Sequence, residues 1–211
     1  MSGDFYFFHK NNKFAFIAAA DCTGHGVPGA FMSMIGAEKL KEAVTHSTDT
    51  SEILSHLNKG IKFSLRQSEG EEATRDGMDI ALCSVDTDNR IVKYAAANRP
   101  IYIIRNGQTE VEEIKATKKA IGGFTEDNQH FDTHEIQLQQ GDTFYLSTDG
   151  YADTFGGEQS KKVTTKRFKQ VLIEIQNKTM KEQEQHLDSF IENWKAGTEQ
   201  VDDILVIGVR L

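Results

Sequence analysis

The chain has 211 residues, 27% of them charged, and a formal net charge of −8. This length supports one full-sized hydrophobic core, and the acidic balance argues against nucleic acid as a partner, because phosphate-backbone binding needs clustered Lys and Arg. The longest apolar run, residues 14–20, is far too short for a membrane span, and the chain does not start like a secretion signal, so we expect a cytoplasmic protein with no membrane insertion by this segment.

The first half of the chain predicts a strand hairpin followed by two helices. Asn11 and Asn12 are turn residues between two apolar runs. Apolar residues then recur at helical spacing, and a second amphipathic pattern starts at a cap near Thr50 or Ser51. The predicted elements are strands at residues 5–8 and 13–20, a glycine-rich corner at 21–29, a helix at 27–45, a second helix from about 50, and a polar loop at 69–77.

The second half predicts mainly short strands, then two helices and a last strand. The Asn106-Gly107 pair is a strong hairpin signal because both residues accept positive φ. Strands and helices do not alternate, so the pattern favours an α+β fold with antiparallel sheets covered by helices. The predicted strands lie at residues 78–85, 91–97, 101–105, 109–114, 130–138, 143–147 and 204–209, and the helices carry Phe168, Val171, Leu172 and Ile175, then Leu187, Phe190, Ile191 and Trp194.

No internal repeat or linker is visible, so we expect a single domain over residues 1–211. The chain enters its first predicted strand almost at once, although termini fray unless they are tied down. We therefore expect a fragment of a longer signalling protein, with an upstream strand and a sensor domain in the same native chain.

Acidic residues follow or precede predicted strands at four places. Asp4, Asp21 and Asp149 each lie beside turn residues, and Asp202-Asp203 precedes the last strand. An isolated Asp beside Gly is usually an ordinary turn, but Asp21 and Asp149 come directly after apolar strands that should be buried. Carboxylates that converge raise one another's pKa, and a bound divalent cation removes that conflict. An all-oxygen ligand set favours Mg²⁺ or Mn²⁺ over Zn²⁺.

Six segments in order are shared with a known superfamily: SGDFYFF, ADCTGHGVPGAFMSMIG, YAAANRPIY, IGG, GDTFYLSTDGYAD and DDILVIG. Together they resemble the metal-dependent (type 2C) protein serine/threonine phosphatases, in particular the bacterial branch typified by the stage II sporulation protein E phosphatase domain. The resemblance spans nearly the whole chain. It implies an αββα sandwich of two antiparallel sheets flanked by helix pairs, with a two-metal site at one edge.

The resemblance also implies roles for individual residues. Asp21 matches the aspartate that bridges both metals, and the backbone carbonyl of Cys22 matches the ligand after it. Asp149 and Asp202 match the carboxylates on the second metal, and Asp4 matches the acidic residue on the first. Asp21, Asp149 and Asp202 are thus the expected catalytic set.

Asp203 and His25 are not expected to carry the chemistry. Asp203 is expected to support the ligands rather than bind metal. His25 lies in the glycine corner, further along than the histidine that eukaryotic relatives use as a proposed general acid, and we do not expect it to be essential. Eukaryotic relatives also place an arginine on the phosphate, and no match for it is visible near Asp4.

The expected reaction is hydrolysis of phosphoserine or phosphothreonine on a regulatory partner protein. Two Mn²⁺ or Mg²⁺ ions would activate the water, and no covalent intermediate is needed. In the resembled branch, the helical pair after the glycine corner acts as a switch that completes the metal site, although the same residues also fit a plain helix start.

Other functions fit less well. A cysteine phosphatase needs a CxxxxxR loop; Cys22 has no Arg at that spacing, and Cys83 to Arg90 is one residue too long. The acidic charge disfavours a metal-dependent nuclease. The alternative that stays open is a catalytically weak sensor or interaction domain on the same fold. Asp76 and Asp79, at the start of a predicted strand, either line the substrate entrance or form a turn.

Overall fold

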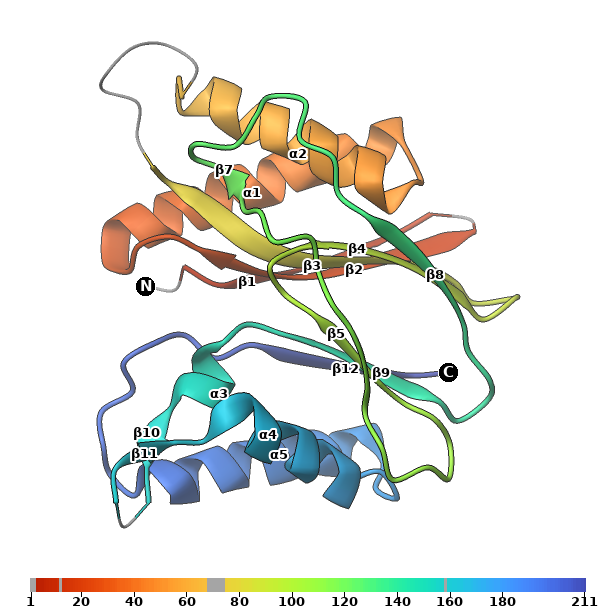
Figure 1. Ribbon diagram of the computed structural model, residues 1–211, viewed down its shortest axis with the longest axis vertical. Coiled ribbons are helices and arrows are strands. Elements are labelled where there is room, and N and C mark those ends of the chain that lie inside the picture. Colours follow the sequence, from red (N-terminus) through yellow and green to blue (C-terminus); the bar gives the residue numbers. More distant parts are fainter. Residues whose placement is uncertain (1–2, 12, 68–74, 158) are drawn as a thin grey trace.

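Two antiparallel sheets pack face to face, and a pair of helices covers the outer face of each, as the computed structural model shows (Figure 1). It describes residues 3–11, 13–67, 75–157 and 159–211. The first sheet has the order β1-β2-β3-β4-β8, with β7 paired to β3. Its strands are β1 (Phe5–Lys10), β2 (Phe14–Cys22), β3 (Gly77–Asp86), β4 (Ile91–Ala97), β7 (Ile121–Gly122) and β8 (Thr133–Gln137).

The second sheet has the order β12-β9-β5-β6, and its paired strands run antiparallel, as in the first sheet. Its strands are β5 (Ile101–Ile104), β6 (Glu112–Ile114), β9 (Thr143–Ser147) and β12 (Val206–Arg210), and β10 (Phe155–Gly156) and β11 (Lys161–Lys162) form a separate small ribbon. The predicted αββα sandwich is confirmed.

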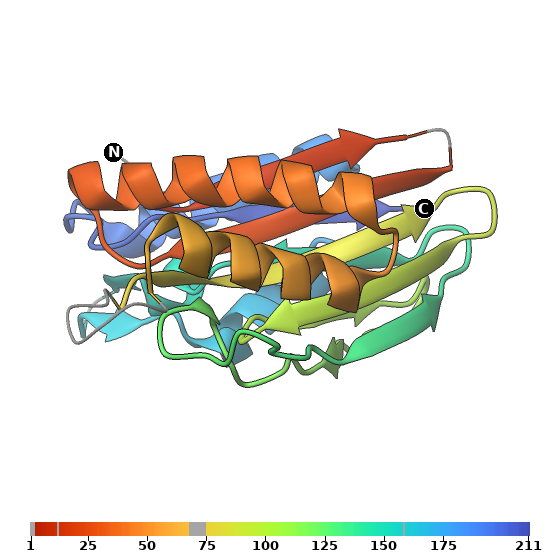
Figure 2. The ribbon, with the colours of Figure 1, turned by 90° about the horizontal axis from the view of Figure 1, so that it is seen from above.

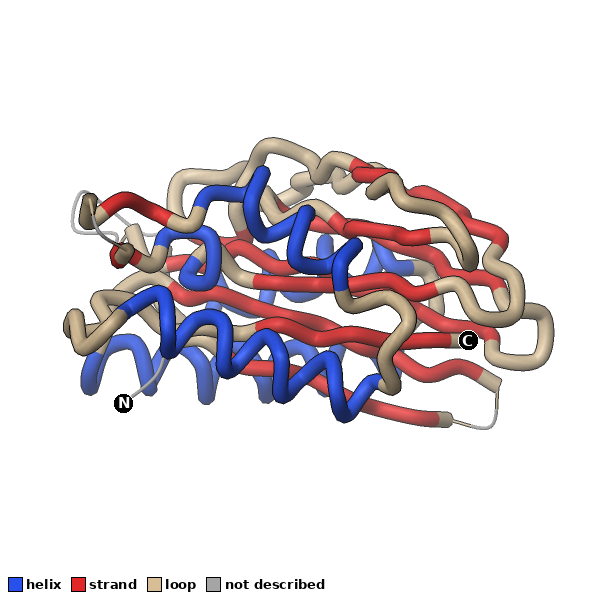
Figure 3. Tube along the Cα trace, turned by 90° about the horizontal axis from the view of Figure 1, so that it is seen from below, coloured by secondary structure: helices blue, strands red, loops and turns tan. Residues whose placement is uncertain are grey.

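The helices lie in two layers. Seen from above, α1 (Gly26–His46) and α2 (Thr50–Ser64) lie side by side over the first sheet (Figure 2). From below, α4 (Thr164–Glu174) and α5 (Met180–Lys195) cover the second sheet (Figure 3). A four-residue helix, α3 (Gly150–Asp153), follows β9 after Thr148 and Asp149. No helix within the described ranges is long and apolar enough to cross a membrane.

Alternating side chains on the central strands build the core between these four layers. In β2, Ala18 and Ala20 face the α1–α2 layer, whereas Ile17 and Ala19 face the second sheet. In β9, Phe144 and Leu146 face the first sheet, and the intervening Tyr145 packs beneath α4 and α5. Both faces of these strands are therefore buried, which explains why they appear in the sequence as continuous apolar runs.

The structure corrects three sequence predictions locally. The cap of α2 is Asp49 rather than Thr50 or Ser51: its side chain accepts hydrogen bonds from the backbone N–H groups of Ser51 and Glu52, at 2.9 and 3.1 Å. Only Gly107 of the Asn106-Gly107 pair has positive φ, +75°, so the turn is not the expected tight hairpin.

The third correction concerns strand lengths. The strand predicted at 109–114 is only Glu112–Ile114, and the one predicted at 130–138 is Thr133–Gln137. Conversely, β2 extends through Asp21 and Cys22, which had been placed in the glycine corner. Asn12 and residues 69–74 of the predicted loop lie outside the described residues.

Candidate active site

Two of the predicted aspartates lie at one edge of the sandwich, where β2 and β9 end. Asp21 is the penultimate residue of β2 and stands directly opposite Asp79 of β3 in the strand register. Asp149 follows β9 and occupies the residue before α3. Two like charges directly across a strand pair repel each other, so this edge needs a cation.

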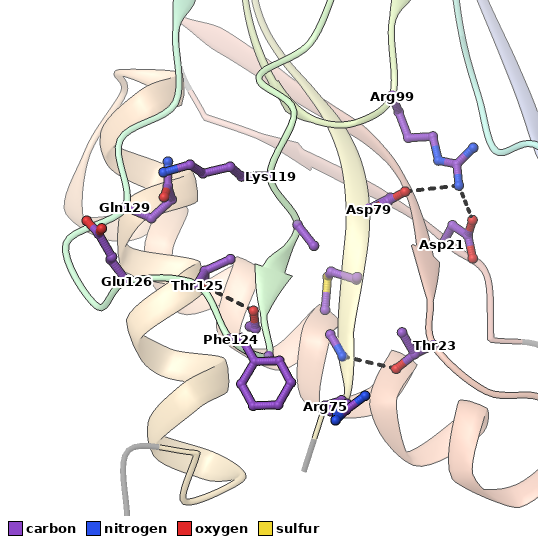
Figure 4. A pocket seen from close by; sticks show the side chains of 15 residues that line it. Asp21, Thr23, Arg75, Asp79, Arg99, Lys119, Phe124, Thr125, Glu126 and Gln129 are labelled. Atoms are coloured by element: carbon purple, nitrogen blue, oxygen red, sulfur yellow. Dashed lines mark hydrogen bonds and ion pairs between the residues drawn. The ribbon is translucent and has the colours of Figure 1, made fainter. Parts of the chain in front are cut away.

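Arg99 supplies that cation. Its Nη2 lies 2.7 Å from Asp21 Oδ2, 3.1 Å from Asp79 Oδ2 and 2.8 Å from Asp149 Oδ2, and Figure 4 shows the guanidinium between Asp21 and Asp79. The side chain of Asn98, a residue with φ of +61°, donates to Asp79 Oδ1 at 2.7 Å. One guanidinium thus holds carboxylates from both sheets together.

The start of the chain lies against the segment before β12. The Gly3 N–H donates to Asp203 Oδ2 at 2.7 Å. Asp4 is hydrogen-bonded to the Thr148 side chain and feels the charges of Asp203, Asp202 and Asp149. Asp202 itself is exposed, and its Oδ1 accepts a hydrogen bond from the Asp203 N–H at 2.9 Å. The four predicted acidic segments therefore meet at the same edge.

Two glycines permit this convergence. A Cβ on Gly150 would lie 1.8 Å from the backbone oxygen of Asp203, and a Cβ on Gly3 would lie 2.8 Å from that of Gly24 and 3.1 Å from that of Cys22. No larger residue fits such backbone approaches. Gly3 thereby brings the Cys22 carbonyl next to the backbone that carries Asp4.

Burial and mutual repulsion change the acidity of these carboxyl groups. Burial raises the pKa of Asp21 to about 8; Arg99 opposes this rise, and Asp149, Asp4 and Asp79 add to it. Burial likewise raises the pKa of Asp4 to about 6, against its hydrogen bond to Thr148. A divalent cation bound between these carboxylates would offset the burial and the mutual repulsion that raise both pKa values.

The donor chemistry at this edge fits a hard divalent ion. Carboxylate and carbonyl oxygens gather there, as Mg²⁺ and Mn²⁺ require. Among the described residues, no three His, Cys, Asp or Glu side chains are arranged as a preformed metal cluster. The Arg99 guanidinium lies between the carboxylates that an ion would join, so binding an ion requires these side chains to rearrange.

The raised pKa of Asp21 predicts a pH dependence of stability. A folded-state pKa of about 8 against an ordinary value of 3.8 means that the folded protein holds this proton more tightly than the unfolded chain. Its contribution to stability is complete below about pH 4 and is lost as the pH rises through 8. Urea unfolding in chelator should show a decline between pH 5 and 9 that is smaller in Asp21→Asn; parallel curves for the two proteins would contradict the shift.

The two cysteine thiols are buried, whereas His25 is exposed. Burial, followed by the charges of Asp21 and Asp4, raises the pKa of the Cys22 thiol to about 12, and burial also raises the pKa of the Cys83 thiol. Both thiols are thus protonated at neutral pH and poor nucleophiles. His25 is exposed at the cap position of α1, and its side chain makes no capping hydrogen bond.

Sequence reasoning did not assign Arg99 to the site, and it left Asp79 between an entrance residue and a turn. The structure puts Asp79 on the wall of a pocket that opens beside Asp21. Arg99 lies within the YAAANRPIY segment, which was noted only as part of the resemblance. Strand register identifies both residues as neighbours of Asp21. Asp79 of β3 pairs with Asp21 of β2, and Arg99 comes shortly after β4, which pairs with β3.

Comparison with known proteins identifies a family for this chain. The family model described as stage II sporulation protein E (SpoIIE) matches residues 12–211. Phosphoserine phosphatase RsbU of Bacillus subtilis (strain 168) is 29% identical over 161 residues, which are 72% of this chain and 43% of RsbU. The match therefore spans less than half the length of that relative.

Solved structures show the same fold. The SiaA-PP2C domain of Pseudomonas aeruginosa matches with a TM-score of 0.88 and 31% identity over 100% of this chain and 81% of that one. RsbX in complex with magnesium matches with a TM-score of 0.68 and 16% identity over 99% of this chain and 86% of that one. With a family model that covers nearly all of its length, the chain belongs to the SpoIIE family, and its fold is that of PP2C phosphatase domains.

Proposed function

We propose that this chain hydrolyses phosphoserine or phosphothreonine on a regulatory partner protein, using water activated by two divalent ions. The observation that carries the proposal is the meeting of four acidic segments, distant in sequence, around Asp21 and Asp149 at one edge of the sheets. Membership of a phosphatase family and the similarity to a phosphoserine phosphatase support it.

In this proposal, Asp21 would contribute to holding both ions. Asp4 and the Cys22 carbonyl would complete the first site, and Asp149 and Asp202 would hold the second. Bound there, Mg²⁺ or Mn²⁺ would lower the pKa of water and stabilise charge on the phosphoryl oxygens. The magnesium of the RsbX complex supports this choice of metal.

Arg99 is the residue that we propose for binding the substrate phosphate. Its side chain is only 16% exposed, and its Nη2 lies within 3.1 Å of three site carboxylates. Its Nε has no hydrogen-bond partner among the described residues. A planar fork of N–H donors suits a phosphate better than a point charge does, so Arg99 can hold and orient the phosphoryl group beside Asp21.

The test is release of phosphate from an aryl phosphate and from a phosphoserine peptide. We expect activity with Mn²⁺ or Mg²⁺, none with chelator, and full activity after thiol-blocking reagents, because the Cys22 and Cys83 thiols are buried and protonated. Full activity in chelator would overturn the metal mechanism. A folded, metal-bound protein without activity on either substrate would indicate instead the catalytically weak sensor or interaction domain.

The biological setting is also a proposal. We infer that residues 1–211 are one phosphatase domain of a longer cytoplasmic signalling protein, with a phosphorylated regulatory protein as substrate and a sensor domain elsewhere in the same chain. The supporting observation is that the match covers only 43% of RsbU. Mass analysis of the native gene product checks the length.

A further inference from the structure

A pocket of about 640 Å³ opens directly beside the carboxylate group of the site. One wall is formed by Asp21, Asp79 and Arg99, and the opposite wall by the segment 119–129, which runs into and out of β7 (Figure 4). When a substrate protein places its phosphoserine at Asp21, this adjoining pocket is within reach of the residues beside that phosphoserine. The pocket therefore lies where residues beside the phosphoserine would go.

The far wall is fixed by polar side chains from α2 and from the turn that follows it. Asn58, which is fully buried, accepts hydrogen bonds on its Oδ1 from the Gly122 N–H at 2.8 Å and from the Thr125 hydroxyl at 2.9 Å. Gln67 Oε1 accepts one from the Gly123 N–H at 2.9 Å. Buried polar networks whose hydrogen bonds are satisfied stabilise a single conformation. The pocket is therefore preorganised, and ligand binding does not have to order this wall first.

Two exposed cations and an aromatic ring line this pocket. Neither Arg75 nor Lys119 forms a salt bridge in the described part of the chain. The Arg75 guanidinium lies 5.0 Å from the centroid of the Phe124 ring, which is 74% exposed. In a chain with a net charge of −8, these are two cations beside the site that no salt bridge within the described residues occupies.

The charged lining groups are balanced in number, with Asp21, Asp79 and Glu126 against Arg75, Arg99 and Lys119. Asp21 and Asp79 share the Arg99 guanidinium, so Arg75 and Lys119 are the lining cations that remain for the carboxylates of a ligand, and Glu126 is the lining carboxylate outside these salt bridges. Gln129 also lines the pocket, is 5% exposed, and its Oε1 accepts no hydrogen bond within the described residues. A buried acceptor without a donor suits a backbone N–H from a bound peptide.

We propose that this pocket binds an acidic segment beside the phosphoserine of the substrate protein. Arg75 and Lys119 pair with its carboxylates, and Gln129 accepts from its backbone. The proposal rests on the proposed phosphatase function and adds a substrate preference to it. The pairing of Arg75 and Lys119 with carboxylates is electrostatic and acts at short range, so it weakens as salt is added.

The test compares two peptides that carry the same serine, one flanked by Asp and Glu and the other by Asn and Gln. Binding of the unphosphorylated, fluorescently labelled peptides is measured by anisotropy, so it needs no turnover. We expect the acidic peptide to bind about tenfold more tightly, a difference of about 1.4 kcal/mol, and the difference to shrink between 0.05 and 0.5 M NaCl.

The double variant Arg75→Gln/Lys119→Gln should lose this preference. The matched control Lys161→Gln/Lys166→Gln removes the same charge from exposed positions beside and on α4, over the second sheet, and should keep it. Equal affinities for the two peptides in the unchanged protein, or loss of preference in the control, would overturn the pocket assignment.

The phosphorylated peptides and an aryl phosphate separate this inference from the proposed function. Mn²⁺-dependent hydrolysis of the aryl phosphate with equal kcat/KM for both phosphopeptides retains the phosphatase and rejects the pocket. A clear binding preference without any hydrolysis retains the pocket as a peptide site and rejects the phosphatase.

Discussion

Asp21→Asn, Asp149→Asn and Asp202→Asn should each lower the turnover number for phosphoserine hydrolysis by at least about 100-fold, the scale seen when one electrostatic stabiliser of a transition state is removed. The replacement keeps the side chain's volume and removes its charge. In the proposed mechanism each of these oxygens binds an ion, so the effect should appear in turnover and in Mn²⁺ half-saturation, measured by single-turnover kinetics and calorimetry.

The control for this series is His25→Ala. His25 is exposed, and its side chain does not cap α1, so its loss should change turnover by less than about tenfold, below the roughly 100-fold that a general acid–base group typically contributes at the least. Circular dichroism should show the same fold in all four variants. A His25→Ala protein as impaired as Asp21→Asn would give that histidine a catalytic role and contradict our assignment.

The layered fold could be predicted because its signals are local. The strand at 143–147 follows from a short apolar run, and the apolar faces of α4 and α5 follow from helical spacing. The smallest elements could not: α3, β7, β10 and β11 have two to four residues, too few for any periodicity. Their conformation is decided by contacts such as that of Gly150 with the Asp203 backbone, which sequence does not display.

The candidate site was only partly visible for a related reason. Asp4, Asp21 and Asp149 could be singled out because each lies beside a predicted strand. Their meeting depends on which strands pair, and in what register. Asp79 enters the site because β3 pairs with β2 so that it stands opposite Asp21, and a shift by one residue would send its side chain to the other face of the sheet.

Arg99→Ala should have the second largest effect, and in a pattern that a purely structural residue would not give. In chelator, three carboxylates would lose their shared cation, so the free energy of unfolding should fall by about 2 kcal/mol. This is less than the loss expected on breaking a fully buried ion pair, because the group is partly exposed. With Mn²⁺ present, the loss should be smaller, because ions bound by Asp21 and Asp149 supply the missing positive charge. Chemical unfolding with and without Mn²⁺ measures both.

The same variant should bind Mn²⁺ more tightly and its substrate more weakly. An ion must share Asp21 and Asp149 oxygens with the guanidinium, 2.7 and 2.8 Å away, so removing Arg99 removes a competitor and should lower Mn²⁺ half-saturation in calorimetry. Without the fork of donors on the phosphate, KM should rise at least about tenfold, and Arg99→Lys, which keeps the charge but not the fork, should recover part of it. An unchanged KM together with weaker Mn²⁺ binding would mean that Arg99 positions the carboxylates and does not bind the substrate. Another residue would then have to bind the phosphate.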